Sequence, residues 1–306
     1  MSIYLLRRLY QALIVFFVVT LIVFLILHIS GDPVQLLMPS DATQKDVQEL
    51  RQALGLDKPL PVQYGLFLKN ALKGNLGISY HHGQPALKLV LDRLPATLEL
   101  VSVSMLISLI LAVPLGVLAS SRRGKWLDRS CLMGSLVGIS APSFWIGIAF
   151  ILIFAVELPW FPSSGRGTWA HLVLPAASLS LYRLALFFRL IRAGMLDIMT
   201  QDYIRTARSK GVSEKTVIYK HALKNTLIPF ITIAGLQMGS LLAGSIVTER
   251  IFAWPGMGRL FLDSIGVMDY PVIIAWTLVV STIFILINLI VDVIYMWLDP
   301  RIRYEK

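Results

Sequence analysis

The sequence predicts an all-α membrane protein with six membrane-spanning helices, from its composition and from the lengths of its apolar runs. Of its 306 residues, 56% are hydrophobic and 15% are charged, whereas soluble domains carry about 25% charged residues. The mean hydropathy is +0.71. The apolar residues gather in runs of about 20 or more, the length with which a helix crosses a bilayer. The runs are Leu9–Ile29, Ala96–Ser120, Cys131–Val156, Leu172–Ile191, Leu227–Val247 and Val272–Trp297.

Basic residues predict the orientation of these spans, because cytoplasmic loops of membrane proteins are enriched in Lys and Arg. The segments between the second and third runs and between the fourth and fifth are the most basic. The connection at 157–171 carries only Arg166, and the one at 248–271 carries Arg250 and Arg259. The two basic segments are therefore expected in the cytoplasm. Both termini are expected there too, because the number of spans is even.

The spans divide the chain into three predicted parts. Residues 1–29 form an N-terminal membrane helix, residues 30–95 an extracytoplasmic segment, and residues 96–306 a core of five further helices. The extracytoplasmic segment is too short for an independent enzyme domain. Apolar residues between Tyr64 and Leu72 recur at helical spacing, which predicts a short helix within it.

A basic segment at 193–229 separates the fourth and fifth spans and is patterned as two short helices. The spacing predicts helices at Tyr203–Lys210 and Glu214–Leu223, with Gly211 allowing the tight turn between them and Pro229 ending the segment. Acidic residues stand near the helix starts and basic residues near the ends, as helix dipoles favour. We expect a soluble partner to dock on this segment. A surface that binds lipid headgroups is the alternative.

The connection after the fifth span, at 248–271, is also patterned. Trp254, Pro255 and Gly256 predict a sharp turn, because Pro restricts φ and Gly adopts values that other residues avoid. Together with Arg259, these residues are candidates for a re-entrant or gate-lining loop. A folded external loop is the alternative.

Two charges fall well inside predicted spans, away from the span ends: Arg183 in the fourth and Asp292 in the sixth. A charged side chain at the bilayer centre costs ~2.5–3.5 kcal/mol on insertion scales, so each of these should face a cavity or a partner. Their depths from the cytoplasmic ends of their spans are similar. We expect either that the two side chains pair, or that Arg183 faces the translocation pathway and meets an anionic part of the cargo. For Asp292, a hydrogen bond to backbone or to a neighbouring helix is the alternative.

Several classes of site are missing from the sequence. It contains no G-x-x-x-x-G-K-[ST], H-E-x-x-H, C-x-x-C or G-x-S-x-G motif. The adjacent His81 and His82 have no nearby Cys or His to complete a metal site. The net charge of +10 follows from membrane topology, so we expect no nucleic-acid partner. We therefore expect no enzyme activity, no metal and no cofactor in this chain, and any energy for transport must come from outside it.

The segment from Tyr203 to Gly211, YIRTARSKG, followed by His221, Asn225 and Ile228-Pro229, resembles the "EAA loop" of bacterial ABC-importer permeases. Arg205-Thr206-Ala207 stands where many members carry E-A-A, a form similar to that of the dipeptide, oligopeptide and nickel branch. Further similar pieces follow one another along nearly the whole chain, among them Gly31-Asp-Pro33, Gly74-Asn-Leu-Gly77, Pro95-Ala-Thr97, Phe252–Arg259, Asn288–Asp292 and Asp299–Tyr304.

This resemblance implies a six-span, type I importer permease in the bacterial cytoplasmic membrane. It also implies partners: a second homologous permease, two ATPase subunits that bind ATP and Mg, and an extracytoplasmic substrate-binding protein, with membrane lipid around the spans. The segment at 193–229 would be the coupling loop, and its contacts to the ATPase would come from Tyr203, Arg205, Thr206, Ala207, Gly211, His221, Asn225 and Pro229.

The implied function is ATP-driven import of short peptides by alternating access. The alternative cargoes within the same class are nickel, a metal–opine chelate and glutathione. An ion-gradient transporter would need several buried carboxylates or discontinuous helices. A membrane-embedded enzyme would need a nucleophile with its base, and a subunit that does not transport is the remaining class.

Overall fold

The computed structural model describes residues 2–29, 45, 48 and 57–298. Part of the expected extracytoplasmic segment and the C-terminal residues from 299 lie outside this range. Within it, the regular elements are helices, with one isolated bridge between Ile78 and Pro85. The predicted all-α class is confirmed.

Five helices in the described part of the chain are long and apolar enough to cross a membrane, and one bent pair makes a sixth candidate. The count agrees with the six apolar runs of the sequence. The five are α1 (Ser2–Ile29), α5 (Ala86–Ser121), α8 (Trp169–Met199), α11 (Lys224–Ile251) and α13 (Tyr270–Leu298), and the bent pair is α6 (Trp126–Ser140) with α7 (Ser143–Phe150) and the π-helix η1 (Ile151–Glu157).

The chain forms two compact units, the first from Met1–Leu94 and Leu260–Ile285 and the second from Pro95–Arg259 and Leu286–Lys306. In the first unit, α1 packs against α4 (Leu60–Leu72), the helix predicted between Tyr64 and Leu72. Phe24 of α1 packs its ring against those of Tyr64 and Phe67. Thr20 Oγ1 and Tyr64 Oη lie 2.9 Å apart, which adds a hydrogen bond to this apolar contact.

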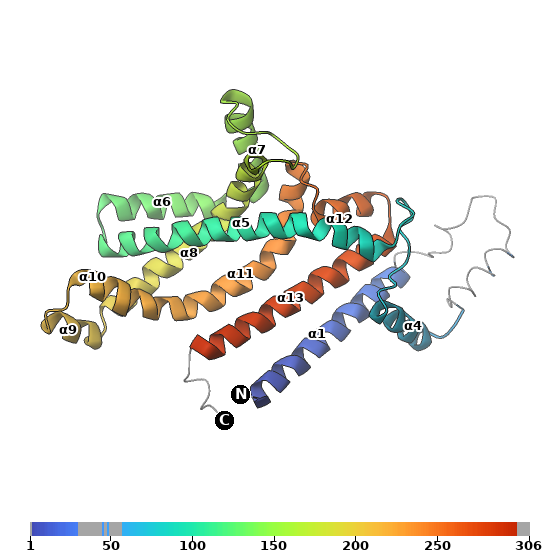
Figure 1. The fold of residues 1–306 in the computed structure, drawn as a ribbon, viewed down its shortest axis with the longest axis horizontal. Helices are drawn as coiled ribbons and strands as arrows, with labels where there is room; N and C mark the ends of the chain where they lie inside the picture. The colour runs from blue at the N-terminus through green and yellow to red at the C-terminus, as the bar shows by residue number, and fades with distance from the viewer. Residues whose placement is uncertain (1, 30–44, 46–47, 49–56, 299–306) are drawn as a thin grey trace. The chain divides into compact units, whose positions relative to one another are not determined.

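In the second unit, α8 is the central helix and packs against α6, α7 and α11 (Figure 1). Small residues bring the helix backbones close together. A Cβ on Gly116 of α5 would lie 2.6 Å from Ile191 Cγ2, and one on Gly194 of α8 would lie 2.8 Å from Thr226 Cγ2. Close approach through small residues is the usual way in which membrane helices pack, because lipid supplies no hydrophobic driving force between them.

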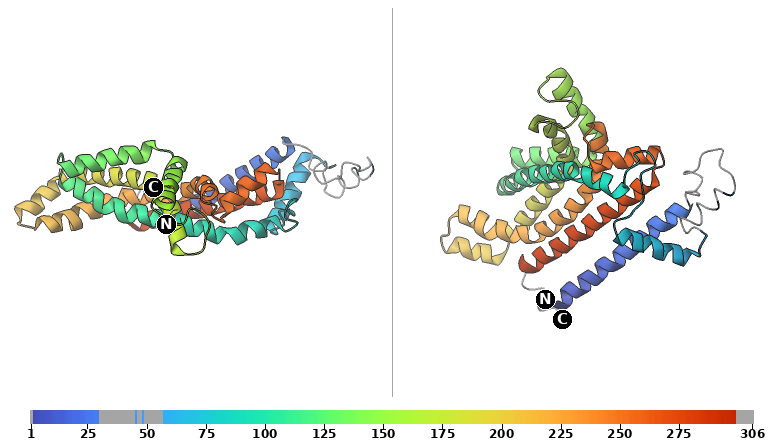
Figure 2. Two further views of the ribbon diagram at one scale, coloured as in Figure 1. Left: turned by 90° about the horizontal axis from the view of Figure 1, so that it is seen from above. Right: turned by 45° about the vertical axis from the view of Figure 1, so that its right-hand side comes forward.

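The third predicted span is a bent pair of helices and not one straight helix. The chain bends by 105° between α6 and the continuous segment of α7 and η1 (Figure 2). Ala141 and Pro142 both leave the helical region, with ψ of 125° and 138°. Proline has no N–H to donate, and it disfavours helical backbone at the residue before it. The apolar run hides this break because hydropathy does not register backbone conformation.

Pro229 does not end the coupling segment, which corrects the sequence-based expectation. α10 (Glu214–Thr216), the π-helix η2 (Val217–Leu223) and α11 follow one another without a break, and Pro229 lies inside α11. Helices in membranes tolerate such prolines because neighbouring groups satisfy the carbonyl that loses its partner. The wide turn of η2 lies just before the proline, and π-helical turns of this kind are common at functional sites.

Candidate functional site

The two helices predicted in the coupling segment are present. The first matches its predicted bounds to within one residue, and the second starts at the predicted residue but continues into α11 instead of ending at Leu223. The first is α9 (Asp202–Ser209), and the second begins at Glu214. Gly211 between them has a φ of +73°, a value that costs other residues strain. An exposed ion pair between Arg208 Nη2 and Glu214 Oε1, 2.7 Å long, spans the turn. Its hydrogen bond raises the pKa of the Arg208 guanidinium.

Buried apolar side chains hold this helix pair against the neighbouring helices of the second unit. Ile204 on α9 and Val217 and Ala222 on η2 are each 0% exposed, and α9 contacts η2 while η2 contacts α8 and α11. Asn225 Nδ2 donates to Tyr203 Oη at 3.1 Å and to the His221 carbonyl at 2.8 Å. Three of the predicted coupling residues, which span 22 positions, therefore meet in one cluster.

The outward side of the helix pair is cationic and aromatic. Tyr203 is 44% exposed and Tyr219 is 53% exposed. Thr206 donates its hydroxyl to the Asp202 carbonyl within α9, and Ala207 is half-buried. We call the exposed residues of this side the coupling surface: Tyr203, Arg205, Lys210, Lys215, Tyr219 and Lys220.

The predicted sharp turn after the fifth span is present, and it packs against other residues of the second unit. Trp254 is 1% exposed, and its Nε1 donates to the Ala96 carbonyl at 2.8 Å. Arg259 Nη1 donates to the Ala253 carbonyl at 3.0 Å, and the Arg166 guanidinium lies 5.7 Å from the Trp254 ring centre. Pro255 and Gly256 carry the chain into α12 (Met257–Gly266).

A buried carboxylate holds this turn, and the sequence analysis missed it. Glu249 is 0% exposed. Its Oε1 accepts hydrogen bonds from Thr97 Oγ1 at 2.7 Å and Ser245 Oγ at 3.1 Å, and its Oε2 accepts from Arg259 N at 2.9 Å. Thr97 Oγ1 in turn accepts from Met257 N at 2.9 Å. We call Glu249, Thr97, Ser245 and the first turn of α12 the Glu249 cluster.

The chemistry of the Glu249 cluster explains why a carboxylate is tolerated there. It meets the N-terminal amides of α12, where the helix dipole favours negative charge, and each described donor compensates part of the cost of burial. Glu249 was not identified from the sequence as a buried charge, because the fifth apolar run was ended at Val247, which placed Glu249 in the following connection. Its partner Thr97 is 152 positions away, and no local pattern reveals such a contact.

A second buried carboxylate holds a loop of the first unit. Asp269 is 1% exposed, and its Oδ2 accepts from Ser79 Oγ at 2.5 Å while its Oδ1 accepts from Tyr80 N at 3.2 Å. Burial, followed by the nearby Asp269 carboxylate, raises the pKa of the Tyr80 hydroxyl. The loop that carries His81 and His82 is thereby fixed beside the start of α13.

A third carboxylate, Asp128 of α6, pairs with Arg192 of α8. Asp128 is 1% exposed, and its Oδ1 and Oδ2 accept from Arg192 Nε at 2.5 Å and Nη2 at 2.8 Å. Gly124 N also donates to Asp128 Oδ2, at 2.9 Å. This bidentate pair joins the cytoplasmic-side ends predicted for two spans.

Replacing Arg192 by alanine is expected to lower the free energy of unfolding by about 3 kcal/mol, because it leaves a buried carboxylate without its cation. The measurement is the thermal unfolding midpoint of the purified protein in detergent. Arg189→Ala is the matched control, since Arg189 is exposed on the same helix. Equal midpoints for the two variants would contradict the prediction.

Arg183, predicted to lie in a span, is central in α8 and 7% exposed. Its guanidinium lies 5.6 Å from the Tyr182 ring centre, and its Nη2 donates to Ser240 Oγ at 3.5 Å. Asp292, on α13, is not among its described contacts, so the pairing of the two charges stays a prediction.

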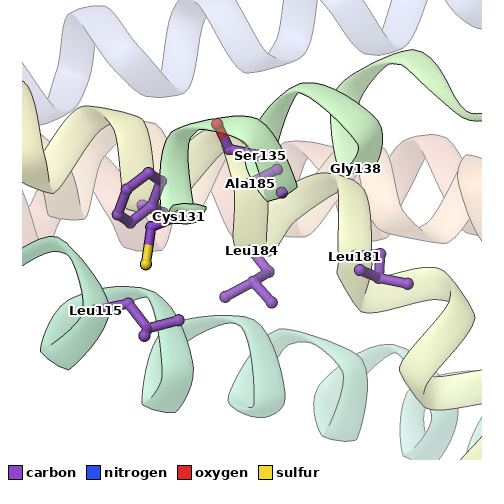
Figure 3. Close-up of a pocket in the computed structure, with 9 residues that line it drawn as sticks. Leu115, Cys131, Ser135, Gly138, Leu181, Leu184 and Ala185 are labelled. Atoms are coloured by element: carbon purple, nitrogen blue, oxygen red, sulfur yellow. The ribbon is translucent and has the colours of Figure 1, made fainter. Parts of the chain in front are cut away.

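An apolar pocket of about 230 Å³ lies on the opposite side of α8, between α5, α6 and α8 (Figure 3). Leu115, Cys131, Leu181 and Leu184 line it with other uncharged residues. Without a charged group, this pocket offers nothing to orient an ionic cargo. In the described ranges no three His, Cys, Asp or Glu side chains stand where they could hold a metal ion.

Known proteins resemble this chain along its whole length. A family model described as "Binding-protein-dependent transport system inner membrane component" matches residues 112–304. A second, "Binding-prot-dependent transport system membrane comp, N-term", matches residues 1–101. The glutathione transport system permease proteins GsiC of Escherichia coli (strain K12) and of Shigella flexneri serotype 5b are each 42% identical to it over 303 residues, covering 99% of both chains.

Among solved structures, an inward-facing conformation of the MetNI methionine ABC transporter matches with a TM-score of 0.57. It covers 70% of this chain and 98% of that one at 20% identity, so this likeness shows the fold alone. The sequence relatives and the two family models cover the segments that carry the coupling surface and the Glu249 cluster. The chain therefore belongs to the family of inner-membrane components of binding-protein-dependent transport systems, as a non-catalytic permease subunit of an ABC importer.

Proposed function

We propose that this permease carries glutathione, or a short peptide of similar size and charge, across the cytoplasmic membrane. The observation that carries the proposal is the 42% identity, over 99% of both chains, to permeases of glutathione transport systems. It favours glutathione, one of the alternative cargoes from the sequence analysis, over dipeptides and longer peptides. Glutathione is itself a tripeptide, so the peptide-transport class is retained.

The importer is driven by partner ATPases and supplied by a substrate-binding protein. We further propose that two ATPase subunits bind the ATP and Mg, and that a second homologous permease pairs with this chain. In this arrangement the coupling segment and both termini face the cytoplasm, while residues 30–95 face the binding protein. The turn at Trp254–Arg259 would then belong to the outer gate.

The coupling surface is proposed to seat in a groove of one ATPase. Two short helices fixed to the bundle by Ile204 and Val217 make a stiff protrusion, which suits the transmission of a small movement. The exposed cations and the two tyrosines offer ion pairs and amphipathic contacts to that groove. Because η2 continues into α11, a push on the helix pair reaches the side of α11 that faces Arg183.

Gly211→Val is expected to reduce uptake at least tenfold while leaving membrane insertion intact. A φ of +73° strains a β-branched residue by roughly 1–2 kcal/mol or more, which misaligns α9 against η2. Gly211→Asn is the matched control, because Asn tolerates this backbone region and no atom lies within 4 Å of an added Cβ. The measurement is the ratio of cargo transported to ATP hydrolysed in proteoliposomes. Equal ratios in the two variants would argue against a coupling role for this turn.

The test of the cargo compares uptake in a strain that lacks this chain with uptake in the same strain after the chain is restored. The labelled cargoes are glutathione, dipeptides and radioactive nickel. Loss of glutathione uptake that the restored chain reverses supports the proposal. Loss of dipeptide uptake alone, or of nickel uptake alone, would assign a different cargo to the same importer class.

A further inference from the structure

Arg183 is a cation at the middle of a membrane-spanning helix. Fourteen residues separate it from Trp169 at the start of α8 and sixteen from Met199 at its end, so at ~1.5 Å per residue it lies more than 20 Å from either end. Its 7% exposure excludes a side chain that reaches the headgroup region. A cation at this depth is costly and is retained where it serves a polar partner.

The structure leaves most of the hydrogen-bonding capacity of Arg183 unused. Its one described hydrogen bond, from Nη2 to Ser240 Oγ, is 3.5 Å long, and its buried Nε has no hydrogen-bond partner. No carboxylate of the described ranges contacts it. The Tyr182 ring, at 5.6 Å, is the other group that favours its charge.

Arg192 on the same helix provides an internal comparison. Its guanidinium makes two short hydrogen bonds to the buried Asp128 carboxylate. Arg192, which joins α8 to α6, is therefore paired with a carboxylate that accepts two hydrogen bonds. Arg183 has the same chemical requirement and, in the described chain, no such group.

The surroundings of Arg183 include a hydroxyl group and a glycine that lies against the guanidinium. A Cβ on Gly244 would lie 3.2 Å from Nη2, so the glycine makes room for the charged head. Ser240 and Gln237 stand one and two turns earlier on α11, and Ser240 Oγ lies 3.1 Å from Gln237 Oε1. Tyr182 is 38% exposed and Ser240 is exposed. We call these five residues the Arg183 niche: Tyr182, Arg183, Gln237, Ser240 and Gly244.

We propose that the Arg183 niche is a binding site for a carboxylate of the cargo during its passage beside α8 and α11. This inference rests on the proposed function, because it needs a cargo that carries a free carboxylate, as glutathione does. The planar guanidinium can donate two parallel hydrogen bonds to such a group. In the low dielectric of the membrane the pairing offsets the cost of holding both charges there.

The test compares glutathione with its glycine amide, which lacks one carboxylate, in proteoliposomes holding the complete transporter. The variants are Arg183→Gln, which removes the charge, and Arg183→Lys, which keeps the charge but loses the bidentate fork. Arg189→Gln is the control, because Arg189 is exposed on the same helix. The affinity of the binding protein for each cargo is measured separately, and the yield of assembled complex is recorded for every variant.

The wild type and Arg189→Gln are expected to prefer glutathione over the amide after correction for the binding protein. In Arg183→Gln, kcat/KM for glutathione should fall about 10- to 100-fold, the effect of losing a charge-assisted hydrogen-bonded pair. The kcat/KM for the amide should fall much less in the same variant, so the preference for glutathione over the amide disappears. Arg183→Lys should lie between the wild type and Arg183→Gln.

An unchanged preference in Arg183→Gln would overturn the inference. An equal loss for both cargoes, with a lower yield of complex, would also overturn it, and would assign Arg183 a structural partner such as a carboxylate of another subunit. If the wild type transports neither peptide, the proposed function and this inference both fail. Transport without any carboxylate preference overturns only the inference.

Discussion

Replacing Glu249 by alanine is expected to abolish uptake and to lower the free energy of unfolding by about 3 kcal/mol or more. The change removes the acceptor for the Thr97 and Ser245 hydroxyls and for the Arg259 amide. Each buried donor left unsatisfied costs about 1–3 kcal/mol. The measurements are the thermal unfolding midpoint in detergent and cargo uptake in proteoliposomes.

Two variants make this expectation specific. Glu249→Gln keeps one acceptor oxygen and nearly the same shape, so its loss should be smaller than that of Glu249→Ala. Glu157→Ala removes an exposed carboxylate at the end of η1 and should leave both readouts near the wild type. If Glu249→Ala behaved like Glu157→Ala, the Glu249 cluster would not hold the turn after α11.

Gly256→Val is expected to have a comparable effect through steric overlap. A Cβ at this position would collide with the Glu249 carboxyl group, which is itself completely buried and held by three described donors. The valine can be accommodated only by breaking those hydrogen bonds or by moving the start of α12. The prediction is loss of uptake, with an unfolding midpoint lowered by several degrees.

Gly266→Ala is the matched glycine control, because no atom lies within 4 Å of a Cβ added there and its φ is not positive. It is the last residue of α12, the helix that begins directly after Gly256. If both glycine variants transported equally well, close packing between Gly256 and Glu249 would not be required. In the double variant Gly256→Val/Glu249→Ala, the unfolding midpoint should fall by less than the sum of the two single effects, because the clash is lost together with the carboxylate.

The sequence predicted the features that local signals determine. The apolar runs predicted the membrane helices, and the bounds of α9 and the start of the second coupling helix were predicted to within one residue. In the second case Gly211 supplies a turn residue that adopts positive φ, and charges that suit the helix dipoles stand near the starts of both helices. Such local signals do not depend on the rest of the fold, so they can be read from the sequence.

The features that the sequence did not predict depend on contacts between distant parts of the chain. Pro142 and Pro229 are both prolines in apolar surroundings, yet one bends the chain by 105° and the other lies inside a continuous helix. Which outcome occurs depends on the neighbouring helices that satisfy or displace the backbone. Glu249, Asp269 and Asp128 each have a side-chain partner 64 to 190 positions away. Only the folded chain brings those groups together.

The carboxylates of Glu249 and Asp269 also differ from the surface ion pairs in their response to ionic strength. Both accept hydrogen bonds from hydroxyl and amide groups inside the protein, where counter-ions have no access. The Arg208–Glu214 pair, with side chains 43% and 55% exposed, lies in solution, and at 1 M salt the screening length is only about 3 Å. A high-salt wash during purification should therefore weaken the ion pair across the Gly211 turn, while the contacts that hold the two carboxylates stay intact. If the coupling surface docks an ATPase as proposed, the same wash should release it.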